Sequence, residues 1–135
     1  MKLDLTSFSK AIASLEMGLN EYTHNKNDFI RDACIQRFEY TYELAWKMLK
    51  RYLEVTSANP VEVDEMSFQN LIRTGSEKSL LLNDWETWAL YRKARSTTSH
   101  VYNEIKAQEV FAQIPGFLVE AQFLLKQLQA QNLNG

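Results

Sequence analysis

Hydrophobic residues recur at helical spacing along most of the chain. The first run predicts an amphipathic helix over residues 6–23, with its apolar face formed by Phe8, Ile12, Leu15, Leu19 and Tyr22. Thr6 or Ser7 can begin this helix as its N-cap, because a short side-chain oxygen can accept an unpaired N–H of the first turn. A polar break follows, after which Asn27 or Asp28 can cap the next helix.

The longest predicted helix covers residues 28–56, and its apolar positions fill roughly half of the circumference. So wide an apolar arc requires more than one neighbouring helix. Glu43 and Lys47 lie on the solvated side, where an i,i+4 pair contributes only a few tenths of a kcal/mol. Arg37 borders the arc. It could point into a cleft, although a surface arginine with its stem along the apolar edge is the favoured interpretation.

The pattern becomes less regular after residue 56. Ser57–Pro60 ends the long helix, and a short helix is predicted over residues 64–74 with Gly75 as its stop. Asn83 or Asp84 then caps a fourth helix.

A last helical pattern begins at Asn103 and includes Pro115-Gly116, where we expect a kink or a break. Residues 129–135 are expected to be a frayed tail.

These elements predict an all-α protein of about five helices in a single domain over residues 1–135. The hydrophobic content of 45% is sufficient for one core. Four glycines and two prolines supply few of the tight turns that a β-sandwich or barrel needs. No internal repeat or second domain is apparent.

Charge and cysteine content narrow the class further. With 15 basic and 17 acidic residues the chain is not a strongly basic nucleic-acid binder, so any contact with RNA must be local. The single cysteine, Cys34, excludes an internal disulfide and fits a reducing compartment. The amino-terminal residues lack an apolar secretory core, and no apolar run approaches membrane-spanning length. We therefore expect a soluble cytoplasmic protein that does not associate with a membrane.

The residues with the most chemical potential gather between Trp85 and Glu104. On an ideal helix one ridge carries Trp88, Arg92, Arg95 and Ser99, with Trp85 beside it. His100 lies about 140° away from Arg95 around the helix. The run Ser96-Thr97-Thr98-Ser99 predicts a helix end before His100, since these hydroxyl groups compete for backbone hydrogen bonds. Residues 90–100 contain three basic residues and no acid, which would attract a small anion.

Each candidate residue here has a functional and a structural interpretation. Histidine can move a proton near neutral pH and arginine can stabilise phosphate charge, so Arg95 and His100 are a possible catalytic pair. By spacing alone, a structural role is favoured. Trp85 and Trp88 could stack on a base, but packing in the core or at a subunit interface is the more common role. Tyr102 could accept a covalent group or simply pack.

Metal and cofactor chemistry is not expected. Gly75-Ser76 followed by Asp84 and Glu86 superficially resembles the metal-binding turn of a nucleotidyltransferase. Those acids should come from a strand, yet Asp84 to Glu86 begins a predicted helix. There is no glycine-rich phosphate loop, and two histidines with one cysteine make no credible zinc site.

Two separated segments carry a family resemblance. Arg37-Phe38-Glu39-Tyr40-Thr41-Tyr42-Glu43-Leu44-Ala45-Trp46-Lys47, followed by Arg95-Ser96-Thr97-Thr98-Ser99-His100-Val101-Tyr102, resembles the nucleotidyltransferase substrate-binding family of HEPN-type bacterial proteins. The similarity covers nearly the whole chain. It implies a compact up-down bundle of helices, usually a homodimer, made with a separate minimal nucleotidyltransferase as a toxin and antitoxin pair.

The resemblance also implies site residues. Arg95 and His100 match an Arg-x4-6-His motif that cleaves RNA without metal in the ribonuclease members. His100 and Tyr102 match its His-x-Tyr extension, in which the partner enzyme transfers AMP to the tyrosine of some members. Ser96 stands where a longer polar residue such as Asn is common. Arg92 and Arg37 are expected to support this site.

Two functions therefore remain open from the sequence. The chain either presents a substrate, or its own Tyr102, to a partner nucleotidyltransferase, or is itself a metal-independent ribonuclease that uses Arg95 and His100. RNA or a nucleotide is the expected ligand in either case. We also expect a homodimer whose interface includes the Trp85–His100 helix, because Trp85, Trp88 and Arg92 form a ridge too aromatic for a solvated face.

Overall fold

The computed structural model describes residues 3–134, which form an all-α bundle with no strand in that range. It contains six α-helices and one 3₁₀ helix: α1 (Thr6–His24), α2 (Asp28–Thr56), α3 (Pro60–Asp64), α4 (Phe68–Glu77), α5 (Trp85–Thr97), η1 (Thr98–His100) and α6 (Glu104–Asn134). The predicted fold class is confirmed. None of these helices is both long and apolar enough to cross a membrane.

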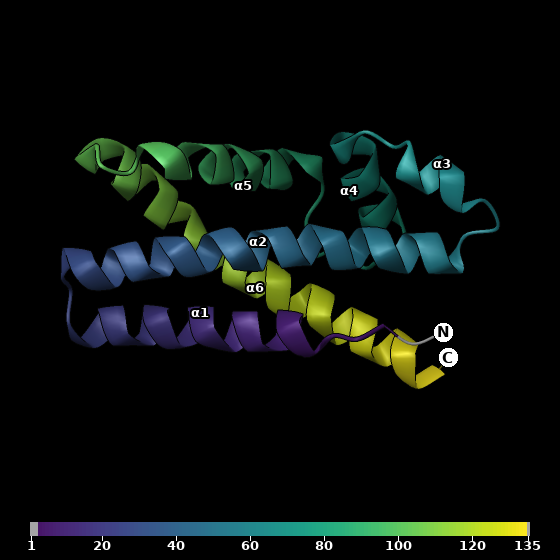
Figure 1. The fold of residues 1–135 in the computed structure, drawn as a ribbon, viewed down its shortest axis with the longest axis horizontal. Coiled ribbons are helices and arrows are strands. Elements are labelled where there is room, and N and C mark those ends of the chain that lie inside the picture. Colours follow the sequence, from purple (N-terminus) through teal and green to yellow (C-terminus); the bar gives the residue numbers. More distant parts are fainter. Residues whose placement is uncertain (1–2, 135) are drawn as a thin grey trace.

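Helix α2 is the central element of the bundle (Figure 1). It packs against α1, which runs antiparallel to it, and against α3, α4, α5 and α6. Helix α6 crosses α2 obliquely and also contacts α1 and α5. The wide apolar arc of α2 is thus covered from several sides, as its sequence predicts.

The centre of the core is aromatic. Phe117 of α6 lies edge-on to Phe38 of α2, with ring centroids 5.1 Å apart, and edge-on to Tyr91 of α5 at 5.3 Å. Trp88 joins this cluster 6.0 Å from Phe117 and is completely buried. Aromatic pairs at such separations add to the stabilisation from apolar burial. Trp88 is therefore a core residue and cannot belong to an exposed aromatic ridge.

Two of the predicted caps are found. The Asn27 side chain accepts the N–H of Ile30 at 2.9 Å at the start of α2, and Asp84 accepts the N–H of Trp85 at 2.7 Å at the start of α5. The cap predicted for α1 is wrong, because Leu5 is the N-cap residue and makes no side-chain capping bond.

The region between α2 and α5 differs most from the prediction. The helix expected over 64–74 corresponds to α4, which begins four residues later at Phe68, and a short helix that was not expected, α3, begins at Pro60. Gly75 does not end α4 but lies buried inside it. A Cβ atom there would come 3.1 Å from the methyl groups of Leu49 and Leu81, so the glycine permits close packing of α4 on α2. Helix α4 ends at Glu77, and the chain turns at Ser79, whose φ is 62°.

Helix α6 also differs from its prediction. It continues through Pro115 as one helix, so the expected break is absent. Residues 129–134 of the expected frayed tail continue α6, which extends to Asn134. The Asn132 side chain bonds both the backbone N–H of Leu3, at 3.3 Å, and its carbonyl oxygen, at 3.0 Å. Gly135 lies outside the described residues.

A buried carboxylate fixes the loop between α4 and α5. Glu120 of α6 is fully buried, and its two oxygens accept the backbone N–H of Leu82 (2.6 Å), the backbone N–H of Asn83 (3.1 Å) and the side-chain amide of Asn83 (3.1 Å). Burial raises the pKa of Glu120, against the opposing effect of these donors. No sequence pattern indicates this anchor, because Glu120 lies 37 residues or more from its partners along the chain.

Candidate functional site

The hydroxyl-rich run after Arg95 ends α5 where the sequence predicts. Thr97 donates its hydroxyl to the Lys93 carbonyl oxygen at 2.9 Å, and Thr98 donates to that of Arg95 at 2.7 Å. The helix tightens there into η1, and α6 does not begin until Glu104. His100 and Tyr102 consequently lie on the short connection between α5 and α6.

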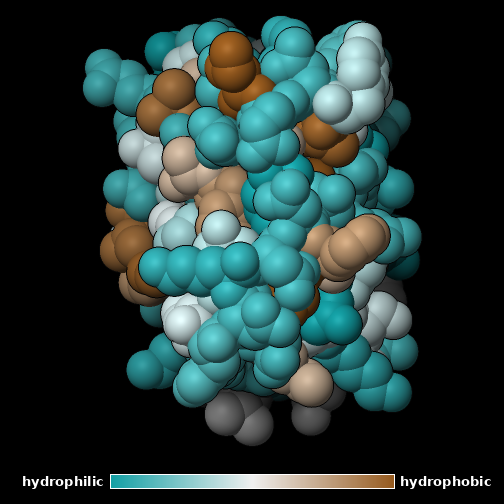
Figure 2. All heavy atoms as spheres, turned by 90° about the vertical axis from the view of Figure 1, so that its left-hand side faces the viewer, coloured by the Kyte–Doolittle hydropathy of each residue, from teal (hydrophilic) through white to brown (hydrophobic). Residues whose placement is uncertain are grey.

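His100 and Tyr102 are both exposed on this connection. Their rings lie edge-on, with centroids 6.3 Å apart, and the Tyr102 side chain is 88% exposed. Tyr102 is thus not a packing residue, and its hydroxyl is accessible. The connection lies at the end of the bundle seen face-on in Figure 2, which is largely hydrophilic with separate apolar patches.

Arg95 points toward α2. Its Nε lies 3.2 Å from Oε1 of Glu43 and its Nη1 3.6 Å from Oε2 of Glu39, while Nη1 donates to the Thr98 hydroxyl at 3.1 Å. The Nε–H is not aligned on an acceptor, so the contact with Glu43 is an ion pair without a full hydrogen bond. Within residues 3–134, no hydrogen bond joins Arg95 to His100.

Glu43 therefore has a different role from the one its sequence suggests. Besides a long contact of 4.0 Å with Lys47, it pairs with Arg95 and accepts the indole N–H of Trp46 at 3.1 Å. The spacing of Glu43 and Lys47 revealed the first contact. The other two depend on how α5 packs on α2 and on the rotamer of Trp46.

Arg37 does not support this site. It lies on the side of α2 that faces α1, where its Nη1 donates to the carbonyl oxygen of Ser14 at 2.6 Å. Arg37 therefore ties α1 to α2 through its guanidinium, and its half-buried side chain borders the apolar arc as the favoured interpretation expects.

The start of α6 is held by a buried arginine that sequence reasoning missed. Arg31 of α2 is 6% exposed, and its Nη1 lies 2.6 Å from Oε1 of Glu104 and 3.5 Å from Oδ1 of Asp28. Its Nη2 lies 3.1 Å from Oδ1 of Asp32. The hydrogen bond lowers the pKa of Glu104 and raises that of Arg31. A signal existed, since Arg31 precedes Cys34 by three positions on the buried face of α2. This contact anchors the residues that follow Tyr102.

Arg92 and Ser96 line an open pocket of about 270 Å³ between α2, α4 and α5. The complete lining is Tyr42, Glu43, Trp46, Phe68, Arg92, Arg95 and Ser96. Of these residues, the sequence indicates only the three on α5 as supporting or catalytic residues.

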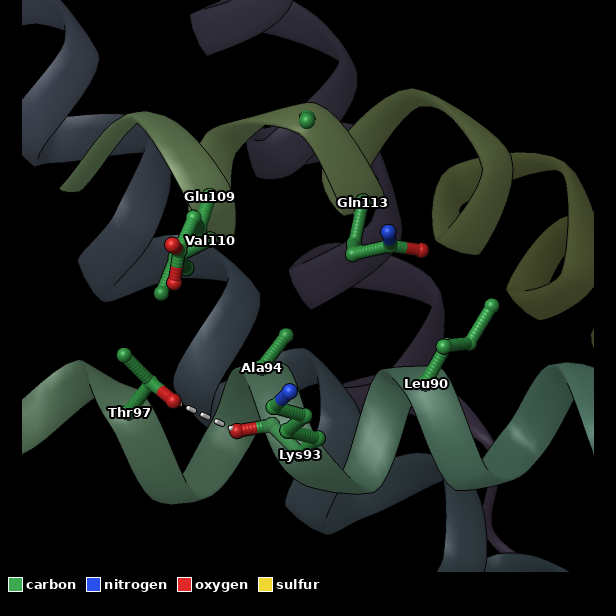
Figure 3. A pocket seen from close by; sticks show the side chains of 8 residues that line it. Leu90, Lys93, Ala94, Thr97, Glu109, Val110 and Gln113 are labelled. Carbon is green, nitrogen blue, oxygen red and sulfur yellow. Dashed lines mark hydrogen bonds between the residues drawn. The ribbon is translucent and has the colours of Figure 1, made fainter. Parts of the chain in front are cut away.

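A second concavity of about 290 Å³ lies between α5 and α6. Figure 3 shows its two sides facing each other, with Leu90, Ala94 and Thr97 on α5 and Glu109, Val110 and Gln113 on α6. We call this the α5–α6 groove. Leu90, half-exposed, and Ala112 add apolar surface, and Lys93 and Glu109 add opposite charges.

No group of three or more His, Cys, Asp or Glu side chains among the described residues is arranged to hold a metal ion.

The all-α bundle, with Arg95 near the end of α5 and with His100 and Tyr102 on the connection to α6, matches the pattern of a HEPN-type helical protein. The chain belongs to the family described as nucleotidyltransferase substrate binding protein like, whose model matches residues 3–130. It is similar to a probable ribonuclease HepT of Haemophilus influenzae, with 34% identity over 97% of this chain and 95% of that protein.

Two solved structures are similar over nearly their full length. HI0074 from Haemophilus influenzae, whose structure is described as revealing the fold of a substrate binding domain of a nucleotidyltransferase, superposes with a TM-score of 0.86 at 34% identity, covering 93% of this chain and 99% of that one. A protein from Thermus thermophilus superposes with a TM-score of 0.70 at 32% identity, covering 90% of this chain and 98% of that one.

Proposed function

We propose that this chain pairs with a separate minimal nucleotidyltransferase, in a toxin-antitoxin-like system of the cytoplasm, and presents its own Tyr102 or a bound substrate for nucleotidyl transfer. The observation that carries the proposal is the 88% exposure of Tyr102 on the anchored connection between η1 and α6. An acceptor hydroxyl must enter the active site of another protein, and an exposed side chain on a fixed turn can do so. Family membership supports the choice of partner.

The transfer reaction balances with ATP as the donor. The Tyr102 oxygen attacks the α-phosphorus of ATP and loses its proton, the bond from that phosphorus to the bridging oxygen breaks, and pyrophosphate leaves. The partner would bind ATP and its metal. His100 would enter the same partner cleft, because its ring lies 6.3 Å from that of Tyr102.

Incubation with the cognate nucleotidyltransferase and ATP is expected to add the mass of one AMP to the peptide that contains Tyr102. Tyr102→Phe should abolish the addition, because it removes the phenolic oxygen that forms the new bond to phosphorus. Tyr40→Phe, which alters another exposed tyrosine on α2, should leave it unchanged. If Tyr102→Phe still gains AMP on the same peptide, the proposed acceptor is wrong.

A ribonuclease function is the second candidate. It is favoured by the full-length similarity to a probable ribonuclease and by the presence of both Arg95 and His100 at one end of α5. In a single copy Arg95 points toward the acids of α2, so a working pair requires Arg95 to turn or a second copy to contribute its residues.

The form in which such residues could meet is a homodimer. Trp88 no longer supports this proposal, since it is buried in the core, but the α5–α6 groove does. In a two-fold dimer the Lys93 of each copy could approach the Glu109 of the other, and Leu90 could fill the opposite groove. Thr97 at the groove's edge immediately precedes η1, so this interface includes the predicted helix.

Light scattering is expected to show a dimer at micromolar concentration. Ala112→Arg should raise the dimer dissociation constant by about tenfold or more, because it places a bulky charge in the groove. Val61→Arg, an equal charge introduced at an exposed apolar position on α3, should not. A wild-type monomer under these conditions would exclude this interface.

A further inference from the structure

The pocket between α2, α4 and α5 has an aromatic wall and a cationic edge. Trp46 and Phe68 are both partly buried, and their rings meet edge-on with centroids 6.2 Å apart. The hydrogen bond from the Trp46 indole to Glu43 sets the orientation of that ring. Here two π systems lie beside solvent instead of within the core.

The cationic edge comes from α5. The Arg92 guanidinium lies 5.1 Å from the centroid of the Phe68 ring, which shows that a planar group can occupy the face of that ring. Arg92 is exposed and forms no ion pair within residues 3–134, in contrast to Arg95, which is shared between Glu39 and Glu43. The charge of Arg92 is therefore available to an anion, and the Ser96 hydroxyl lies on the same lining.

We propose that this pocket binds one nucleotide. The base packs against Trp46 and Phe68, and the phosphate pairs with the guanidinium of Arg92 as it moves off the Phe68 ring. Stacking on aromatic rings tolerates any base, whereas a planar guanidinium suits phosphate oxygens better than a point charge does. Glu43 offers an acceptor for an N–H on the base edge.

The size of the pocket limits the ligand. Its volume of about 270 Å³ is just below the roughly 300–1,000 Å³ of typical ligand pockets, so it accommodates one base with its phosphate and not a longer stretch. That nucleotide can be a free mononucleotide or one unit of an RNA strand. The choice of a nucleotide as the ligand rests on the proposed function. Binding in this pocket does not require transfer of AMP to Tyr102.

Titration of the full chain with AMP, followed by calorimetry, tests the assignment. AMP should bind, while adenosine and ribose 5-phosphate, each lacking one half of the recognition, should bind at least about tenfold more weakly. Arg92→Ala and Trp46→Ala should each weaken AMP binding roughly tenfold. The affinity of Arg92→Lys for AMP should lie between those of Arg92→Ala and the wild type, because lysine keeps the positive charge but lacks the planar guanidinium group. Arg73→Ala, which removes the same charge from the exposed side of α4, is the matched control and should bind AMP normally.

The same titration with a short oligoadenylate separates the two sources of the nucleotide. If the oligoadenylate binds more tightly than AMP, and Arg92→Ala weakens both ligands by the same factor, the natural ligand is one unit of an RNA strand. If the oligoadenylate binds as tightly as AMP or more weakly, the ligand is a free nucleotide. Lack of AMP and oligoadenylate binding at millimolar concentration would overturn the proposal, as would equal losses in Arg92→Ala and Arg73→Ala. Arg92 is exposed, so its variants decide the matter even if Trp46→Ala does not fold. AMP addition to Tyr102 can succeed or fail independently.

Discussion

RNA cleavage by the purified protein is expected to fall about 10²- to 10⁴-fold when His100 is replaced by alanine, the range typical for loss of a general base. In the proposed reaction the 2'-hydroxyl oxygen attacks the adjacent phosphorus and His100 accepts the hydroxyl proton. The bond from phosphorus to the 5'-oxygen breaks, this oxygen takes a proton from water and leaves as a 5'-hydroxyl, and a 2',3'-cyclic phosphate remains. Arg95→Ala should also reduce the rate strongly, because the guanidinium stabilises the negative charge that develops on phosphorus. The measurement is cleavage of labelled RNA in excess chelator.

His24→Ala is the matched control for this experiment, since His24 is the other histidine of the chain and lies exposed at the end of α1. It should cleave RNA at the wild-type rate. His100 is also exposed, so its replacement should leave the helical spectrum unchanged. Activity that survives in His100→Ala, or that disappears with chelator, would exclude this mechanism and leave nucleotidyl transfer as the function.

Glu120→Ala is expected to lower the free energy of unfolding by about 2–3 kcal/mol, because two backbone N–H groups and one amide lose their acceptor. Glu120→Gln should cost less, since its remaining oxygen can still accept from the loop. Glu21→Ala, an exposed position on α1, should change stability little. Urea denaturation measures each value, and an unchanged stability of Glu120→Ala would contradict the anchoring role of this carboxylate.

The pH dependence of stability provides a second measurement on Glu120. Burial raises its pKa above the ordinary value of 4.5, so the folded chain binds this proton more tightly than the unfolded chain does. The contribution of this bound proton to the free energy of unfolding is fully present below pH 4.5, and it is lost as the pH rises through the raised pKa of Glu120. The free energy of unfolding of Glu120→Gln should therefore fall less over that interval than that of the wild type.

The sequence predicts long amphipathic helices well here because their packing follows local periodicity. Helices α1 and α2 begin and end within a residue or two of the predicted limits, and α5 ends as its hydroxyl run indicates. Gly75 shows where local rules fail. It resembles a helix stop, yet its role is to let α4 approach Leu49 and Leu81, which no local pattern reveals.

The candidate site also contains residues whose positions the sequence predicts and residues whose positions depend on how the helices pack. The positions of His100 and Tyr102 follow from a local helix end, and the sequence predicts them. The orientation of Arg95 depends on Glu39 and Glu43 of α2, more than 50 residues earlier, and the helical ridge that contains Trp88 and Arg92 separates into a buried and an exposed residue. A helical projection gives angular positions but not the surface that packs against them.

The pairing of Arg95 with Glu39 and Glu43 also affects which anions can bind to this guanidinium. An incoming anion must displace two carboxylates already near the guanidinium, at 3.2 and 3.6 Å, before it gains a favourable interaction. A small monovalent ion such as chloride has too little charge to compete with both. A phosphodiester or nucleotide bound as proposed would also contact Arg92 and the aromatic wall, and these contacts would compensate for that displacement. The acids of α2 would thus favour larger, multiply bound phosphates over small salt ions at Arg95.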